Sequence, residues 1–202
     1  LMTSPSDGFG ISPRAVTVST VGIPRAMRKL ARENLGVCLA ISLNAADDRT
    51  RILPMPGQSR RPIESVLDAG LYFFENTRRR VTLEYVLIGG INDSRGAARR
   101  LARLVRGKPF KLNLIPYNPL PGDEFAPPDP VRCRRFADTL TSLGIPATVR
   151  ASQGGDIGAA CGQLAPPRRK TKPRPGWARP AGSAGCRRVQ RRRRRSGRPA
   201  GR

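Results

Sequence analysis

A cysteine in a glycine-rich segment is the most chemically distinctive residue of the 202-residue chain. Cys161 lies between Ala160 and Gly162, and such small neighbours leave a thiol accessible and its backbone free to move. No histidine occurs in the sequence, which excludes Ser-His, Cys-His and His–metal mechanisms unless another chain supplies the imidazole. With no base beside it, Cys161 is open to two interpretations, an inert thiol or a reactive one.

The remaining cysteines do not complete a metal site. The four cysteines, at positions 38, 133, 161 and 186, contain no Cys-x-x-Cys spacing, so a self-contained zinc or iron–sulfur site is excluded. Cys38 falls in an apolar run typical of a buried strand, and Cys133 on the apolar face of a predicted helix. Both are therefore expected to be core residues, and no metal ligand is predicted in this chain.

Hydroxyl and amide side chains recur where predicted strands end. They are Ser19 and Thr20, Ser42 and Asn44, Asn118, and Ser152, which ends the fifth predicted strand together with the charged Arg150. Taken singly, each is a common turn or capping residue. Taken together, such neutral groups suit hydrogen bonds to a ribose, an amino-acid moiety or a base edge rather than acid–base catalysis.

The elements that must position these groups alternate between two hydrophobic periods. Apolar runs predict strands at residues 16–19, 37–43, 81–88, 110–115 and 147–151. Helical spacing predicts helices that begin at Pro24, at Pro62, at Asp93 or Ser94, and at residue 130. Glycines at 36, 107 and 144 would end three of these helices. In the first helix, we expect Met27, Leu30, Ala31 and Leu35 on the buried face.

Strand–helix alternation with nearly continuous apolar strands predicts an α/β fold with a parallel sheet. Right-handed crossovers would place successive strands side by side. In a β/α barrel the carboxyl ends of the strands meet at one mouth, so the strand-end side chains would line one pocket. No Gly-x-Gly-x-x-Gly or P-loop follows a strand, which argues against a nucleotide-phosphate fold.

Charge divides the chain into two predicted parts. The sequence holds 38 Lys and Arg against 14 Asp and Glu, and residues 166–202 contribute +15 of the net +24 without one acidic residue. This Arg-, Pro- and Gly-rich tail is predicted to be disordered, either as an RNA-binding arm or as a stretch without a selected role. Residues 1–165 form the predicted folded domain. Their excess of basic residues would attract a polyanion or reflects a genome rich in G and C.

Neither a run of about 18 apolar residues nor a signal peptide is found. We therefore expect no membrane association and a cytoplasmic location. The sequence opens without a visible domain start, which indicates a fragment.

Five co-linear segments resemble one family. They read GFGISPRAVTVSTVGIP, LAISLNAADD, RVTLEYVLIGGIND, KLNLIPYNPLPG and VRASQGGDIGAACGQLA. In this order and spacing they closely resemble the carboxyl-terminal half of the RlmN family, radical S-adenosylmethionine (SAM) enzymes that methylate C2 of adenine in RNA. The resemblance covers residues 8–165. It implies a partial (β/α) barrel of the radical SAM type, incomplete in this chain.

The resemblance also implies roles for individual residues. In such enzymes SAM binds across the barrel mouth, and the matching positions here are Ser19, Ser42, Leu43, Asn44 and Asn118. The family usually has histidine where this chain has Asn44, and an amide can replace one hydrogen bond of an imidazole. Cys161 matches the cysteine that the family methylates.

The implied reaction explains why a cysteine is needed. C2 of adenine is electron-poor, so direct displacement on a SAM methyl group is not feasible. Instead, one SAM methylates the cysteine, and a second SAM is cleaved reductively at a [4Fe-4S] cluster to give a 5′-deoxyadenosyl radical. This radical takes a hydrogen from the S-methylcysteine, and the resulting methylene radical adds to C2. A second cysteine resolves the adduct by forming a disulfide. The barrel supplies position and dry surroundings.

Several parts of the family pattern are missing from this sequence. The cluster motif Cys-x-x-x-Cys-x-x-Cys is absent, as are the Gly-Glu motif that holds the SAM amino group, the resolving cysteine and the amino-terminal RNA-binding domain. We therefore expect a truncated chain, inactive alone, whose partners are its missing amino-terminal half, 23S rRNA and tRNA. Its first strand would be an open edge, and the chain less stable than its length suggests.

Two alternative functions remain. A Cfr-like enzyme would methylate C8 of adenine on a similar scaffold. A non-catalytic remnant would bind RNA through its Arg-rich tail, with strong salt dependence and no methylation.

Overall fold

A computed structural model describes residues 10–55, 61–119 and 123–150. The strands are β1 (Thr17–Thr20), β2 (Cys38–Ser42), β3 (Val81–Leu87), β4 (Phe110–Pro116) and β5 (Ala147–Val149). The helices are α1 (Pro24–Glu33), α2 (Asp48–Arg51), α3 (Ile63–Thr77), α4 (Arg95–Val105) and α5 (Pro130–Ser142), with a 3-10 turn η1 (Pro13–Ala15) before β1. The predicted alternation of strands and longer helices is confirmed. The disordered tail and the boundary at residue 165 are predictions that lie outside the described residues.

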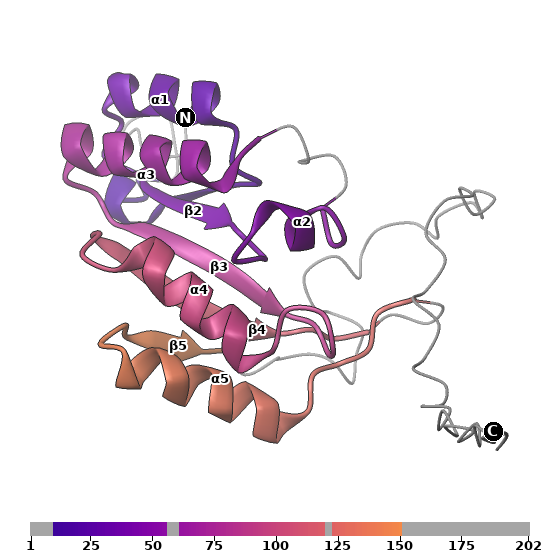
Figure 1. Ribbon diagram of the computed structural model, residues 1–202. Helices are drawn as coiled ribbons and strands as arrows, with labels where there is room; N and C mark the ends of the chain where they lie inside the picture. The colour runs from indigo at the N-terminus through magenta and orange to yellow at the C-terminus, as the bar shows by residue number, and fades with distance from the viewer. Residues whose placement is uncertain (1–9, 56–60, 120–122, 151–202) are drawn as a thin grey trace, which may run out of the picture. The chain divides into compact units, whose positions relative to one another are not determined.

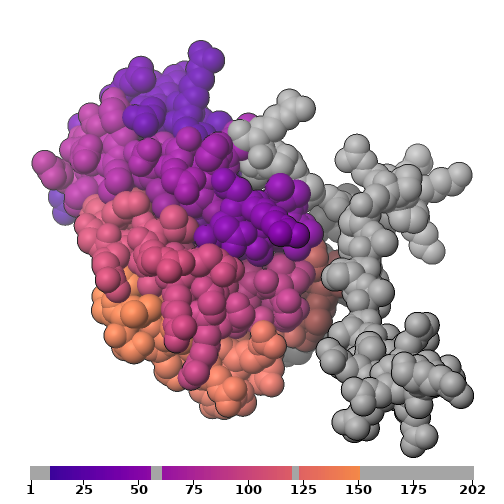
Figure 2. All heavy atoms as spheres, viewed as in Figure 1, coloured from indigo at the N-terminus to yellow at the C-terminus, as the bar shows by residue number. Residues whose placement is uncertain are grey.

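The five strands form one parallel sheet in sequence order, β1-β2-β3-β4-β5. This confirms the α/β class and the prediction that successive strands lie side by side. The helices α1, α3, α4 and α5 lie along one side of the sheet (Figure 1), and their side chains form a continuous layer over it (Figure 2). Helix α2 lies near the carboxyl end of β2 (Figure 1).

The core lies between the sheet and these helices. On β3 the residues Val81, Leu83, Tyr85 and Leu87 are fully buried, whereas the residues between them are only half-buried. Alternation of this kind places one set of side chains against the helices and the other set on the opposite face. Each large apolar side chain buried in this way contributes about 1.5–3 kcal/mol. Helix packing therefore fixes which face of each strand is free to bind a ligand.

The helix boundaries follow local capping chemistry. Ser94 caps α4, because its Oγ accepts a hydrogen bond from the Ala97 amide at 3.1 Å. Of the two predicted starts, Asp93 and Ser94, the second is therefore the cap. Helix α1 ends before Asn34, whose φ of +45° gives it a left-handed conformation, so the prediction that this helix runs to Gly36 is wrong. Leu35 lies beyond the helix and is 56% exposed rather than buried.

The two described cysteines differ in their surroundings. Cys133 is buried in the core, as predicted. Cys38 is only half-buried, and its thiol donates a hydrogen bond to the Arg14 carbonyl at 3.7 Å. The core position predicted for Cys38 is therefore wrong, because the side chain points away from the helix-covered face.

Strand β1 pairs only with β2 among the described residues, so it is an open edge of this sheet. No described helix is long and apolar enough to cross a membrane.

Candidate functional site

A row of polar side chains lies on the face of the sheet that the helices do not cover. Strand register aligns Ser42 with Glu84, Glu84 with Asn113, and Asn113 with Thr148. Ser19 lies on the same face of β1, because it pairs with Ala40, two residues before Ser42. We call this row, from Ser19 to Thr148, the open face. It brings together two of the predicted site residues, Ser19 and Ser42, on neighbouring strands.

Glu84 is the one charged residue in this row of five aligned side chains, from Ser19 to Thr148. Its Oε1 accepts a hydrogen bond from Asn113 Nδ2 at 3.1 Å. Its Oε2 is buried and has no hydrogen-bond partner. Leaving a buried acceptor unpaired costs about 1–3 kcal/mol, and more when it is charged, so this oxygen favours a ligand that donates a hydrogen bond. Glu84 was missed at the sequence level, although a lone acidic residue inside the run VTLEYVLI was a usable signal.

Asn118 offers the complementary group. It lies two residues beyond β4 and is half-buried, and its Nδ2 is buried without a hydrogen-bond partner. The preceding residue is held in place, because the Tyr117 amide donates to the Leu87 carbonyl at 2.9 Å. The Tyr117 hydroxyl donates to Asp123, and burial together with this bond raises the pKa of Tyr117 to about 12. The segment after β4 thus presents an unused amide donor on a fixed support.

Asn44 has a structural role in this arrangement. Its φ of +59° places it in the left-handed region, which asparagine tolerates better than most residues. Its Oδ1 accepts a hydrogen bond from the Val86 amide at 3.1 Å, and its Nδ2 lies 3.3 Å from the Met55 sulfur. The Asn44 side chain therefore ties the end of β2 to β3.

Leu43 does not direct its side chain to the open face. The side chain is fully buried in the helix-side core. Its amide donates to the Glu84 carbonyl at 2.9 Å, and its carbonyl accepts from Arg51 Nε at 3.2 Å. Any contact between Leu43 and a ligand is thus confined to the backbone.

A buried arginine joins the loops at the carboxyl ends of the strands. Arg51 is 2% exposed and donates to the carbonyls of Leu43, Arg61 and Val21, at 3.2, 3.1 and 2.8 Å. Burial lowers the pKa of its guanidinium, and the three carbonyls satisfy donors that water would otherwise solvate. The guanidinium thereby links the segments after β1, after β2 and before α3. No sequence pattern predicted this role.

A buried asparagine makes a second link. Asn92 Oδ1 accepts from the Ile88 amide at 2.7 Å, while its Nδ2 donates to the carbonyls of Val86 and Asn44, at 2.6 and 2.9 Å. The Asn92 carbonyl accepts from the Tyr85 hydroxyl at 3.0 Å. The motif GGIND thus closes the loop after β3 and holds it against the end of β2.

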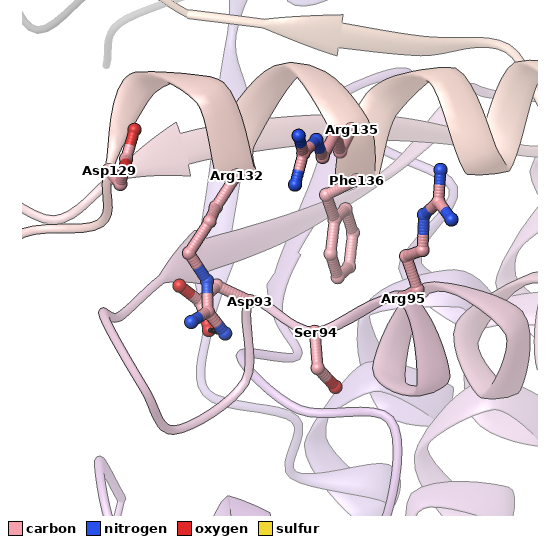
Figure 3. Close-up of a pocket in the computed structure, with 7 residues that line it drawn as sticks. All are labelled: Asp93, Ser94, Arg95, Asp129, Arg132, Arg135 and Phe136. Atoms are coloured by element: carbon pink, nitrogen blue, oxygen red, sulfur yellow. Dashed lines mark hydrogen bonds and ion pairs between the residues drawn. The ribbon is translucent and has the colours of Figure 1, made fainter.

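A hollow of about 720 Å³ lies between α4 and α5 (Figure 3). In it, Arg132 of α5 donates to Asp93 Oδ1 at 2.7 Å, and the Gly90 amide donates to the same oxygen at 3.2 Å. Arg95 and Arg135 approach from the two helices on either side of Phe136 (Figure 3). The carboxylates of Asp93 and Asp129 lie among the three arginines, so the net charge of the hollow is small. The ion pair accounts for this arrangement as a link between α5 and the loop after β3.

The remaining predicted positions contribute less. Thr20 Oγ1 accepts from the Gly22 amide at 3.2 Å, which is the turn role that the residue type alone predicts. The amide of the exposed Arg150 donates to the Leu114 carbonyl at 2.9 Å and so continues the sheet. Cys161 and Ser152 lie outside the described residues, so the proximity of Cys161 to the open face stays a prediction.

Comparison with curated proteins identifies the chain's relatives, although no protein-family model matches it. It is 48% identical over 157 residues to a "Probable dual-specificity RNA methyltransferase RlmN" of Thermus thermophilus, covering 78% of this chain and 44% of that protein. It is 48% identical to a "Dual-specificity RNA methyltransferase RlmN" of Nautilia profundicola (78% and 45% covered) and 52% identical to one of Anaeromyxobacter sp. (79% and 42%). The chain thus spans less than half the length of these relatives.

Solved structures agree with these relatives. A radical SAM methyltransferase from Sphaerobacter thermophilus superposes with a TM-score of 0.76 at 46% identity, covering 80% of this chain and 47% of that one. A domain of a pyruvate-formate lyase-activating enzyme from Bacteroides vulgatus gives a TM-score of 0.52 at 20% identity (67% and 80% covered), a likeness of fold alone. The predicted partial barrel of the radical SAM type and the resemblance first seen in five sequence segments are confirmed.

Proposed function

This chain is a homologue of the carboxyl-terminal portion of RlmN-type radical SAM RNA methyltransferases, and we propose that it forms that portion of such an enzyme. In this proposal the whole enzyme methylates C2 of a specific adenine in 23S rRNA and in tRNA, with Cys161 carrying the methyl group as S-methylcysteine. Support comes from curated relatives at about 48% identity and from the polar open face of the sheet. The chain alone, at 44–45% of the length of those two relatives, would be inactive.

The unpaired Glu84 oxygen on the open face carries the assignment of the SAM site. SAM presents donors, in its ribose hydroxyls, ammonium and adenine amino group, and acceptors, in its carboxylate and adenine ring. Glu84 Oε2 lacks a donor and Asn118 Nδ2 lacks an acceptor. The residues present therefore fit SAM, with Ser19, Ser42, Glu84 and Asn118 as the groups that would hold it. Once bound, SAM supplies the methyl group and the means of hydrogen abstraction.

The described residues supply no ligands for a [4Fe-4S] cluster. No group of three or more Cys, His, Asp or Glu side chains among them could hold a metal ion. A cluster enters the proposal through the relatives, and another segment of polypeptide would hold it.

This chain's own contribution is to position the groups that bind the cofactor. Arg51 and Asn92 fix the loops at the carboxyl ends of β1, β2 and β3, and fixed loops reduce the entropic cost of aligning the reacting groups. The apolar core packs against the helix side of the sheet and holds the strands that carry the open face in register.

A chimera tests the proposed function. This chain would replace the matching segment of the Nautilia profundicola relative, and RNA from cells expressing the chimera would be digested and analysed by chromatography and mass spectrometry. We expect 2-methyladenosine, which should disappear in Cys161→Ala and persist in Cys186→Ala. A soluble chimera that binds SAM but forms no methyladenosine would contradict the proposal.

The same experiment separates the alternatives. Formation of 8-methyladenosine would identify Cfr-like chemistry on this scaffold. RNA retention without any methylation would identify a binding remnant. The outcomes do not overlap, because 8-methyladenosine is separated from 2-methyladenosine by chromatography and a binding remnant forms neither nucleoside.

A further inference from the structure

Five basic side chains converge on one hollow at the amino ends of β2, β3 and β4. They are Arg14, Arg78, Arg79, Arg80 and Lys111, and we call the hollow that they line, of about 510 Å³, the basic pocket. No acidic residue lines it. No ion pair between described residues holds any of the five cations.

Local backbone geometry brings these side chains together from three segments. Arg78 ends α3 with a φ of +53°, a left-handed turn that directs the chain into β3. Lys111 lies on β4 in register with Thr82, two residues after Arg80. Arg14 belongs to η1, and its carbonyl accepts the hydrogen bond from Cys38 that fixes η1 beside β2.

Composition alone does not explain this convergence. An arginine-rich sequence scatters its charges over the surface, and in the hollow between α4 and α5 arginines lie beside the carboxylates of Asp93 and Asp129. In the basic pocket the charges are of one sign, and Phe74 and Phe110 form an apolar wall. A cleft lined by one sign of charge with walls of low dielectric concentrates the electric field, while its cations repel one another until an anion binds.

We propose that the basic pocket binds phosphates of the RNA backbone, as a second contact with the RNA substrate at the end of the strands opposite the mouth. The inference rests on the proposed function for the identity of the polyanion. The seven residues of β3 span about 20 Å, a distance that a short run of nucleotides can cover. A folded RNA of tens of nucleotides can therefore reach both ends of the sheet.

Chemical footprinting on the full-length chain tests the inference. The chain would be treated with phenylglyoxal, which modifies arginine, with and without a 20-nucleotide single-stranded RNA, and each arginine quantified by peptide mass spectrometry. We expect RNA to slow modification of the exposed Arg78 and Arg80 at least fivefold. The exposed Arg25 on α1 and Arg103 on α4 are the controls, and their rates should change less than twofold. Equal protection of all four would overturn the inference.

A second arm distinguishes RNA from a small anion. Inorganic phosphate would be added at the same total phosphate concentration as the RNA. We expect no protection, because a single phosphate releases few counterions and cannot span the pocket. Protection by phosphate equal to that by RNA would overturn the RNA assignment and indicate a site for a small anion.

Substitution gives an independent measurement. The double variant Arg78→Gln/Arg80→Gln removes two cations from the pocket, whereas the matched variant Arg25→Gln/Arg32→Gln removes two exposed cations from α1. Each lost contact should reduce the magnitude of the negative slope of log K against log salt by about 0.7. At 0.1 M salt this corresponds to roughly fivefold weaker binding. We expect about 25-fold weaker binding of the same RNA for the pocket variant and less than twofold for the control. Equal losses in the two would contradict the proposal, and unchanged thermal melting confirms that both fold.

Failure of this inference and failure of the proposed function give different results. Protection of Arg78 and Arg80 by RNA without methylation by the chimera supports the basic pocket and contradicts the enzyme assignment. Methylation by the chimera without that protection overturns the basic pocket alone.

Discussion

The buried guanidinium of Arg51 is the residue on which the loops at the carboxyl ends of the strands depend most. Three carbonyls from three segments converge on it. Lysine offers a compact point charge rather than a planar fork of donors, so Arg51→Lys can satisfy only part of this set. Neither the pattern of charges nor the hydrophobic period of the sequence distinguishes Arg51 from the exposed Arg49 two residues earlier.

We predict that Arg51→Ala lowers the free energy of unfolding by about 3–5 kcal/mol, because it leaves buried carbonyls unpaired and opens a cavity. Arg51→Lys should lose somewhat less. Urea denaturation followed by circular dichroism measures both. Arg49→Ala, an exposed change on the same helix, is the control and should stay within about 0.5 kcal/mol of the unchanged chain. Equal losses at 49 and 51 would contradict the role of Arg51.

The thiol of Cys133 provides a prediction about pH. Burial raises the pKa of Cys133, and the nearby carboxylates of Asp93 and Asp129 raise it further. The thiolate is the reactive form, so at pH 8 Cys133 should react with iodoacetamide at least tenfold more slowly than the half-buried Cys38. Because the folded pKa is raised, the rate for Cys133 should keep rising as pH increases above 8. Peptide mass spectrometry would follow both sites, and equal rates would show that Cys133 is not buried.

At the scale of elements, Asn92 closes the loop between β3 and α4 and holds it to the end of β2. Replacing it with alanine removes two donors and one acceptor from buried backbone groups. We predict that Asn92→Ala lowers the free energy of unfolding by about 3 kcal/mol, since each unpaired buried group costs about 1–3 kcal/mol. The exposed Asn76, which bonds the Tyr72 carbonyl within its own helix, is a matched control, and Asn76→Ala should cost less than 1 kcal/mol. Thermal and urea unfolding measure both changes, and similar losses would refute the role of Asn92.

The strands and longer helices were predictable because their hydrophobic periods extend over many residues. Along the seven residues of β3, buried positions alternate with half-buried ones. In α4 the buried residues recur at helical spacing up to Leu101 and Val105. Helix α2 has only four residues, too few for a period to emerge. Leu35 was predicted to be buried, but the left-handed Asn34 ends the helix before it and leaves it exposed. Cys38 was predicted to be in the core, but the face of β2 on which it lies is the one that the helices do not cover.

The candidate site was predictable only in part. Strand-end position placed Ser19 and Ser42 on one face, because alternation along parallel strands follows from the sequence. The hydrogen bonds that engage Asn44 and the burial of Leu43 depend on a loop geometry that no local pattern encodes. Glu84 was not predicted because it lies in the middle of a strand, whereas polar residues at strand ends were the signal for a site.

At the scale of the whole molecule, the two ends of the sheet carry different chemistry. The open face and the carboxyl ends present hydroxyl, amide and carboxylate groups, whereas the amino ends present five cations without an acid. One end is thus suited to a zwitterionic cofactor and the other to a polyanion. Under the proposed function, the cofactor would bind at one end of the sheet and RNA phosphates at the other.

The SAM dissociation constant of the chimera, measured by equilibrium dialysis, tests the assignment of the open face most directly. Glu84→Gln preserves volume and an oxygen acceptor for Asn113 but removes the charge of the unpaired Oε2, and Glu64→Gln, exposed on α3, is the matched control. We predict that Glu84→Gln weakens SAM binding about tenfold or more, as expected for a hydrogen bond to a charged group, without lowering the melting temperature. Glu64→Gln should leave binding unchanged. Unaltered SAM affinity in a folded Glu84→Gln chimera would show that the cofactor binds elsewhere.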